Sequence, residues 1–165
     1  MALVPATCAA ALWTAYSPIV LGTPVNYAPA FASAYETYAS AGTVPGATNT
    51  GGTESILEAF VAAVISRVET IDEFAQALAD YWATVAITPG SPAHGGTSVT
   101  SVVNDALSQV AAFRSAIVAS ITDVDTAPYF EQLIVNIENI GVSAVTWTVT
   151  ELIGGVPTPF SENIS

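Results

Sequence analysis

The chain has almost no positive charge. Its 165 residues include no lysine and two arginines, Arg67 and Arg114, against 14 acidic residues, so the formal net charge at pH 7 is −12. A nucleic-acid surface needs a basic stripe that displaces counterions from phosphates, and an anionic membrane attracts the same kind of charge. We therefore expect neither nucleic acid nor membrane as a partner.

Cysteine and histidine are equally scarce. Cys8 is the single cysteine, so no disulfide forms within the chain, and a small buried role is expected for its thiol. His94 is the single histidine, and no cysteine, histidine or aspartate spacing that a metal site would need converges with it. No nucleophile motif accompanies either residue. The sequence therefore predicts no catalytic residue, no metal and no cofactor, and we expect that the protein is not an enzyme.

Charge of either sign is rare overall. Only 10% of the residues are charged, whereas roughly a quarter is usual for a globular domain, and the first charged side chain is Glu36. A signal peptide would need a basic start, and Pro5, Pro18, Gly22 and Pro24 interrupt the roughly 20 apolar residues of a membrane span. We expect instead that neighbouring proteins cover part of the uncharged surface, most simply in a homo-oligomer.

A loop pattern occurs twice, with an offset of 44 residues. Residues 45–53 read Pro-Gly, four residues and Gly-Gly-Thr, and residues 89–97 repeat this pattern. Related stretches rich in alanine and aromatic residues precede the two loops, at 31–38 and 74–81. Repeats of this kind are typical of stacked units that bury a shared core. The sequence predicts a duplicated helix-loop-helix.

Helical periodicity covers most of the chain up to residue 141. Within 54–86, Thr70 and Glu73 form a capping-box pair that would start a new helix. The apolar stripe keeps one phase across the whole segment, however, which favours a single helix of about 50 Å. The expected helices are 6–16, ending near Ser17-Pro18, then 27–41, 54–86, 99–121 and 127–141.

The period changes to two from Val142 onward, where apolar residues alternate with threonines. The inward set is Val145, Trp147 and Val149. An isolated strand leaves its backbone groups unpaired, so this one needs a partner. The partner is either the tail beyond Gly154-Gly155, in which Pro157 and Pro159 weaken a ladder, or a strand of a neighbouring subunit.

These patterns together predict a mainly α-helical fold. We expect a helical bundle made from the duplicated helix-loop-helix, with a short C-terminal β-strand arm. The chain would form one domain over 1–165, divided into an N-terminal arm or helix (1–24), duplicated helical hairpins (25–141) and the strand-like arm (142–165).

The two Gly-Gly-Thr loops have competing interpretations. Free amides before a helix resemble an anion cradle. Neither loop has a lysine or arginine nearby, so a tight turn followed by a helix cap, at Thr53 and Thr97, is the favoured interpretation.

Interface residues are predicted from their place on the helices and the strand. Both arginines fall at the edge of an apolar stripe, where each would pair with a carboxylate. Aromatic residues anchor a core or an interface, and small residues on 54–66 let another helix approach closely. The predicted interface set is Trp13, Tyr38, Ala59, Ala63, Arg67, Trp82, Arg114, Val145, Trp147 and Val149.

Low charge, an uncharged start, small-residue helix faces and a strand without a partner all favour a protein that acts through protein contacts. In composition and arms the chain resembles small virion components of tailed bacteriophages, such as capsid decoration or tail-associated proteins, although no motif specific to one such family is present. The resemblance implies a structural protein of the virion, bound to itself or to other virion proteins.

Two alternatives stay open. One is a secreted, Ala-rich helical partner protein similar to the mycobacterial helical-hairpin exports, whose Trp-x-Gly turn this chain lacks. The other is a small-ligand binder or enzyme with a pocket near His94.

Overall fold

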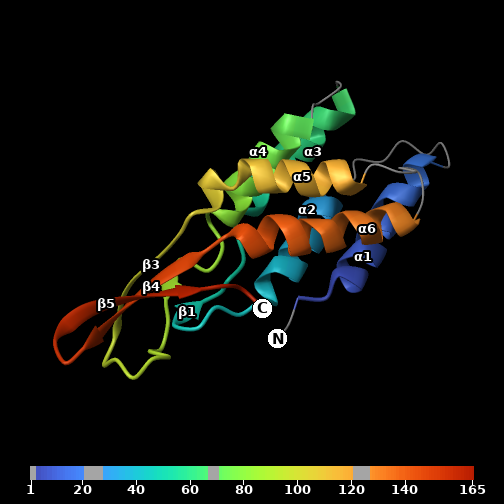
Figure 1. Cartoon of the computed structure of the whole chain (residues 1–165). Coiled ribbons are helices and arrows are strands. Elements are labelled where there is room, and N and C mark those ends of the chain that lie inside the picture. Colours follow the sequence, from blue (N-terminus) through green and yellow to red (C-terminus); the bar gives the residue numbers. More distant parts are fainter. Residues whose placement is uncertain (1–2, 21–27, 67–70, 121–126) are drawn as a thin grey trace.

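The computed structural model describes residues 3–20, 28–66, 71–120 and 127–165 (Figure 1). Within these ranges the chain forms six α-helices and two small antiparallel sheets. The helices are α1 (Pro5–Val20), α2 (Ala28–Ser40), α3 (Glu54–Ser66), α4 (Ile71–Trp82), α5 (Val110–Ser120) and α6 (Ala127–Asn136). The strands are β1 (Ala47–Thr48), β2 (Thr88–Pro89), β3 (Val99–Asn104), β4 (Trp147–Ile153) and β5 (Val156–Glu162). The predicted fold class is therefore wrong, because the chain is mixed α and β rather than a helical bundle with a strand arm.

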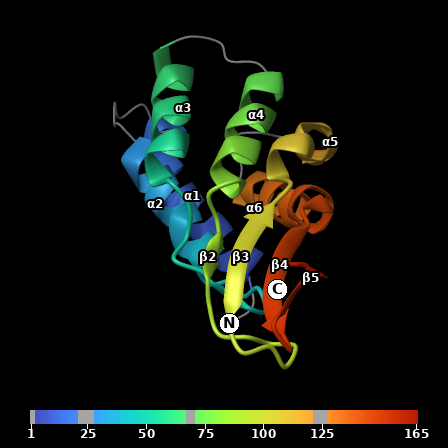
Figure 2. The same ribbon diagram turned by 90° about the vertical axis from the view of Figure 1, so that its left-hand side faces the viewer.

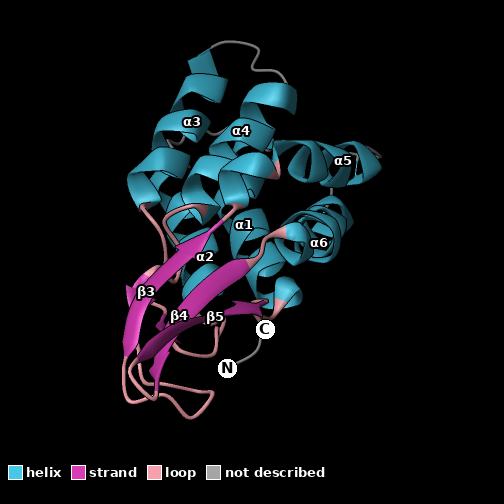
Figure 3. Cartoon of the chain, turned by 60° about the vertical axis from the view of Figure 1, so that its left-hand side comes forward, coloured by secondary structure: helices cyan, strands magenta, loops and turns pink. Residues whose placement is uncertain are grey.

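The six helices form a closed ring. Each helix packs on the next along the chain, and α6 returns to α1 (Figures 1 and 3). Each amphipathic stripe thus finds a neighbouring helix on which to bury its apolar side chains. The largest fully buried side chains include Trp82, Trp147, Tyr35, Tyr81 and Phe113. None of the helices in the described ranges has the length and apolarity that a membrane span requires.

The single helix predicted over 54–86 is wrong. Helix α3 ends at Ser66, α4 begins at Ile71, and the two lie side by side (Figure 2). One continuous apolar phase suits two helices that fold back, because both stripes then face a shared core. Thr70 of the capping pair lies outside the described residues. Helix α1 also differs from its prediction, since it continues to Val20, past the expected end at Ser17-Pro18.

The larger sheet has the order β3-β4-β5 and extends from one end of the helical ring (Figure 3). Strand β4 is central, so it is neither an arm nor free to join a neighbouring subunit. Residues 99–104, predicted as the start of a helix, form β3 instead, with Val102 opposite Val149. The stretch is rich in β-branched residues, and β4 needs hydrogen-bond partners on both sides when it is buried between them.

The tail pairs with β4 through the Gly154-Gly155 turn despite its prolines. Pro157 lies opposite Leu152 and Pro159 opposite Thr150. Residues two apart direct their backbone groups to the same edge of a strand, and a proline is tolerated where that edge faces outward. Both prolines therefore leave the ladder with β4 intact and remove two N–H donors from the outer edge of β5. This edge is poorly suited to strand addition.

The two repeated loops lie against each other. We call residues 45–53 the first loop and residues 89–97 the second loop. Near the start of each loop, strand β1 pairs with strand β2, and Gly90 N donates to Gly46 O at 2.9 Å. The copies then diverge, because the first loop leads into helix α3 and the second into strand β3. The duplicated unit is helix-loop-helix in the first copy and helix-loop-strand in the second.

The end of α4 joins the helices to the sheet. The rings of Trp82 and Trp147 meet edge to face, with centroids 6.3 Å apart. Trp147 Nε1 donates to Val85 O at 3.0 Å. Asn104 Nδ2 donates to Trp82 O at 3.0 Å and to Val85 O at 3.3 Å. The last carbonyls of a helix lack partners within it. Asn104 of β3 thus caps the last carbonyl of α4, and Trp147 of β4 binds the carbonyl of Val85 in the turn that follows.

Gly141 offers a test of how closely α5 packs. The π-helical segment η2 (Ile137–Gly141) lies against α5, and a methyl group on Gly141 would lie 2.7 Å from Cε1 of the buried Phe113 ring. Gly141→Ala should therefore lower the free energy of unfolding by about 1–3 kcal/mol in a urea titration. Ser143→Ala, at an exposed neighbour, should change it by less than about 0.5 kcal/mol. Equal midpoints for Gly141→Ala and the wild type would contradict this packing.

Candidate functional site

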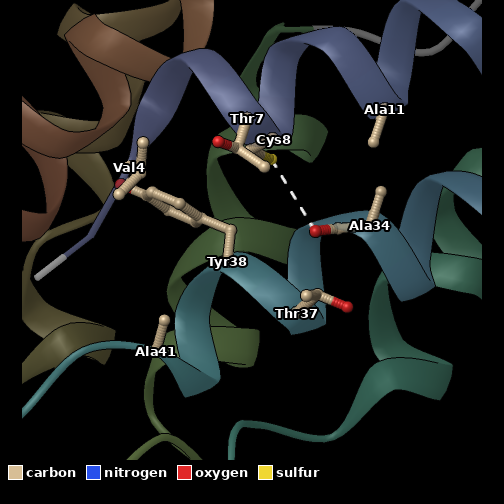
Figure 4. Close-up of a pocket in the computed structure, with 8 residues that line it drawn as sticks. All are labelled: Val4, Thr7, Cys8, Ala11, Ala34, Thr37, Tyr38 and Ala41. Carbon is tan, nitrogen blue, oxygen red and sulfur yellow. Dashed lines mark hydrogen bonds between the residues drawn. The ribbon is translucent and has the colours of Figure 1, made fainter. Parts of the chain in front are cut away.

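An apolar groove of about 320 Å³ lies between α1 and α2 (Figure 4). Its lining is spaced three and four residues apart on each side, which places the side chains on the facing surfaces of the two helices. The lining residues are Val4, Thr7, Cys8, Ala11, Ala34, Thr37, Tyr38 and Ala41. None of these side chains is charged. Most of them are too small to fill the space between the helices, and this leaves the groove.

Cys8 lies within the groove wall and not at its mouth. Its side chain is buried, as the sequence predicts, and Sγ donates to Ala34 O at 3.8 Å (Figure 4). Burial raises the pKa of the Cys8 thiol to about 12. The thiol is therefore protonated at neutral pH, and a protonated thiol is a poor nucleophile.

Tyr38 connects the groove to the last helical turns. Its hydroxyl donates to Glu138 Oε2 at 3.0 Å, across from α2 to η2. Burial, together with the nearby Tyr35 and Glu138, raises the pKa of Tyr38 well above its ordinary value. The phenol is thus a fixed neutral donor, and the groove is a surface for contact with apolar groups.

A second feature is the cradle that the second loop forms around Glu151 of β4. The side chain of Glu151 is 0% exposed. Ala93 N donates to Oε1 at 2.6 Å, Gly96 N donates to Oε2 at 3.0 Å, and His94 N lies 3.1 Å from both oxygens. Burial by itself would raise the pKa of Glu151, but these amides and the His94 ring hold it below the ordinary value.

The first loop forms an equivalent cradle. Gly52 N donates to Glu36 Oε2 at 3.0 Å, and the Tyr81 hydroxyl donates to the same oxygen. Gly52 and Gly96 occupy the same position in the repeat. The anion cradle considered from the sequence therefore exists in both copies, and each holds a carboxylate of this chain.

The predicted threonine caps have different outcomes. Thr53 directly precedes α3, and its N–H donates to Thr84 Oγ1 at 2.8 Å. Thr97 precedes β3, so its prediction as a helix cap is wrong. Its N–H donates to Leu152 O at 2.9 Å and fastens the end of the second loop to β4.

His94 lies between two carboxylates. Nδ1 is 3.1 Å from Glu151 Oε1, and Nε2 is 2.8 Å from Glu162 Oε1. The ring stacks on Phe160 with centroids 3.9 Å apart, and the His94 side chain is 27% exposed. Both ring nitrogens are thus engaged, and the groove between α1 and α2 includes none of these residues. In the described part of the chain, no three histidine, cysteine or acidic side chains are grouped to hold a metal ion.

The predicted interface residues lie in three kinds of place. Trp82, Val145, Trp147 and Val149 are fully buried in the core. Trp13 is half-buried and contacts Phe130 of α6, with centroids 6.2 Å apart, and Tyr38 lines the groove. Ala59 and Arg114 are exposed. Arg67 and the side chain of Ala63 lie outside what the structure describes.

Arg114 has the carboxylate partner that the sequence predicts. Its Nε lies 2.5 Å from Asp72 Oδ1, and the two side chains are 55% and 72% exposed. The pair joins α5 to α4 at the surface, away from any apolar interior. Water screens such a pair, so it adds little to stability.

The sequence analysis missed the two glutamates that organise the loops. Glu151 continues the inward phase set by Trp147 and Val149, and a carboxylate at an inward position needs buried donors. That alternation was the available signal for Glu151. No comparable signal marks Glu36, because its donor Gly52 comes from beyond α2.

Cys8 gives a chemical test of the groove wall. At pH 8 about one thiol in 10⁴ is ionised when its pKa is near 12, so the native chain should react with a disulfide reagent at least about 100-fold more slowly than the chain in guanidinium. In a Cys8→Ser background, Thr37→Cys places a thiol at the exposed edge of the groove and should react promptly. A native Cys8 that reacts as fast as the unfolded chain would show that α1 does not bury it.

The pH dependence of stability tests the Glu151 cradle. A carboxyl whose pKa is lowered by folding stabilises the native state fully above the ordinary glutamate pKa, and this contribution disappears as pH falls through the lowered value. Glu151→Gln should be less stable than the wild type at pH 7 and should lose less of its unfolding free energy between pH 7 and pH 3. Urea titrations measure both effects, with Glu131→Gln on the exposed face of α6 as the control. Parallel pH profiles for wild type and Glu151→Gln would refute the assignment.

No protein-family model matches this chain, and neither a curated protein nor a solved structure matches it. No activity or partner is therefore transferred to it from a relative, and its function is inferred from its own residues and their geometry.

Proposed function

We propose that this chain is a structural protein that acts through contacts with other proteins, as a component of a bacteriophage particle such as a capsid decoration or tail-associated protein. The observation that carries the proposal is the apolar groove between α1 and α2 (Figure 4). Its volume of about 320 Å³ and its apolar lining suit an aliphatic or aromatic side chain of a partner, which is the usual anchor of a protein interface.

The distribution of charge supports this use of the groove. The net charge is −12, so two copies repel each other wherever their acidic side chains lie opposite one another. Helix α1 carries no charged side chain, and no residue that lines the groove is charged. A protein surface can therefore approach here without removing a charge from water, which would oppose binding.

The outward face of the larger sheet is a second uncharged surface. Thr148 lies between Val103 and Ser161, and Thr150 lies between Ser101 and Pro159. Val103 is 57% exposed. Two uncharged faces on different sides of one chain suit a particle component, which contacts more than one neighbour.

The side chains and amides that could react with or bind a ligand contact other groups of this chain instead. The Cys8 thiol is protonated and buried, and both nitrogens of His94 face carboxylates. The cradle amides of both loops hold Glu36 and Glu151. These contacts favour assembly over catalysis as the role of the protein.

Charge placed in the groove tests the proposal. Ala11→Arg puts a guanidinium into the groove, whereas Ala10→Arg changes an exposed residue of α1 that does not line it. Light scattering after size-exclusion chromatography, over a range of concentrations, should show a wild-type oligomer that Ala11→Arg weakens at least about tenfold. Ala10→Arg should assemble as the wild type does, and circular dichroism should show both variants folded. Equal assembly of the two variants would count against the groove, and a wild type that stays monomeric throughout would count against self-association.

A further inference from the structure

The second loop is attached to the sheet in an unusual way. We call residues 91–96 the loop tip. None of its residues is buried, so no apolar side chain fixes it to the core. Four donors in the tip, three amides and the Nδ1 side of His94, instead converge on the carboxylate of Glu151. One carboxylate therefore accepts most of the hydrogen bonds of the tip, and the contacts of the His94 ring with Glu162 and Phe160 add to them.

The titratable groups around Glu151 are few. His94 comes from the tip itself, and Glu162 of β5 faces the other nitrogen of the His94 ring. On its other sides Glu151 meets Val99 of β3, and Gly46 of the first loop packs nearby over Val149. No arginine or lysine of the described ranges contacts it. The ionised carboxylate is stabilised by the tip, and the tip is held in turn by the ionised carboxylate.

Protonation would break this arrangement. An ionised carboxylate accepts hydrogen bonds at both oxygens, whereas the neutral acid carries a hydrogen on one of them. A hydrogen on either oxygen would compete with the amides that donate to that oxygen, because each oxygen accepts from two amides of the tip. Buried donors that lose their acceptor are costly, and an exposed loop relieves this cost by moving into water.

The first loop lacks this dependence, although it has the same pattern. Asn49 Nδ2 donates to Ala39 O at 2.8 Å and to Gly42 O at 2.9 Å, and Gly51 N donates to Asn49 Oδ1 at 2.8 Å. Val44, just before the loop, is buried in the core. Neutral contacts thus hold the first loop in addition to Glu36.

We infer that Glu151 is an acid-sensitive latch: when its carboxylate takes up a proton, residues 91–96 leave the sheet as a unit while the helical core and the first loop stay folded. Opening frees His94 from Glu151 and uncovers the ring of Phe160, on which His94 stacks. Opening at low pH agrees with the lowered pKa of Glu151, because the closed tip favours the ionised carboxylate. The latch goes beyond the proposed assembly role and does not rest on it.

Hydrogen exchange of the full-length chain tests the latch. Nuclear magnetic resonance should follow the amides of Ala93, His94 and Gly96 from pH 7 to pH 3, together with the side-chain carboxyl carbon of Glu151. Between the ordinary glutamate pKa and the lowered pKa of Glu151, protection of these amides should fall by up to about tenfold for each unit of decreasing pH, because opening then takes up one proton. The matched controls are the Gly51 amide of the first loop, which donates to the neutral Asn49 Oδ1, and the indole N–H groups of Trp82 and Trp147. All three should keep their protection over that range.

Two variants separate Glu151 from its neighbours. Glu151→Gln should leave the tip amides unprotected already at pH 7, whereas Glu162→Gln should keep them protected at pH 7 and open at a similar pH to the wild type. The inference is overturned if the tip and the indoles lose protection together, if the tip stays protected after Glu151 has titrated, or if Glu162→Gln opens the tip at pH 7. If Glu151→Gln does not fold, the wild-type titration is sufficient by itself. Selective loss of protection at the tip supports the inference, whereas joint loss with the indoles or lasting protection of the tip overturns it.

Discussion

The structure depends on how the end of α4 is bound. A helix that stops inside a protein leaves carbonyls without donors, and here the donors come from the sheet. Asn104 of β3 donates to the last carbonyl of α4, that of Trp82, and both Asn104 and Trp147 of β4 donate to the carbonyl of Val85 in the turn that follows. The same contacts bring Trp147 against Trp82, whose own Nε1 donates to Tyr35 Oη at 2.9 Å. One junction thus fixes the ring of helices, the position of the sheet and the aromatic core between them.

The two repeated loops are each fixed by the same kind of contact, a glycine amide that donates to a buried or partly buried glutamate. In each copy the second glycine of Gly-Gly-Thr donates to a glutamate, Glu36 on a helix and Glu151 on a strand. Each glutamate belongs to an element that the loop must cover, so the cradle fixes the loop on its own support. Added neutral contacts through Asn49 hold the first loop, and the second relies mainly on its carboxylate. The repeat therefore gives one geometry with two different sensitivities to acid.

The contacts that stabilise the fold and the surfaces proposed for partners lie in different parts of this chain. The charged groups that lie inside are occupied by internal partners, as Glu138 is by Tyr38 and Glu151 by the second loop. The surfaces without charged side chains are the groove between α1 and α2 and the outward face of the sheet. This separation supports a role in assembly, because the contact surfaces are distinct from the contacts that hold the fold.

The sequence by itself determined the local features: helices at 28–40 and 127–136 and the alternation that forms β4. It left open whether the tail beyond Gly154-Gly155 or a neighbouring subunit pairs with β4, and the structure shows that the tail does. Local periodicity was sufficient there because neighbouring residues decide those conformations. It failed at 99–104, where a pattern compatible with a helix became β3, and at 54–86, where one phase served two helices. Only the tertiary structure decided these two cases. Residues 99–104 form a strand because β4 needs hydrogen-bond partners on both edges, and residues 54–86 contain two helices because the apolar stripe of each helix needs another helix to pack against. It also decided the site, since Glu151 meets its donors from 55 or more residues away.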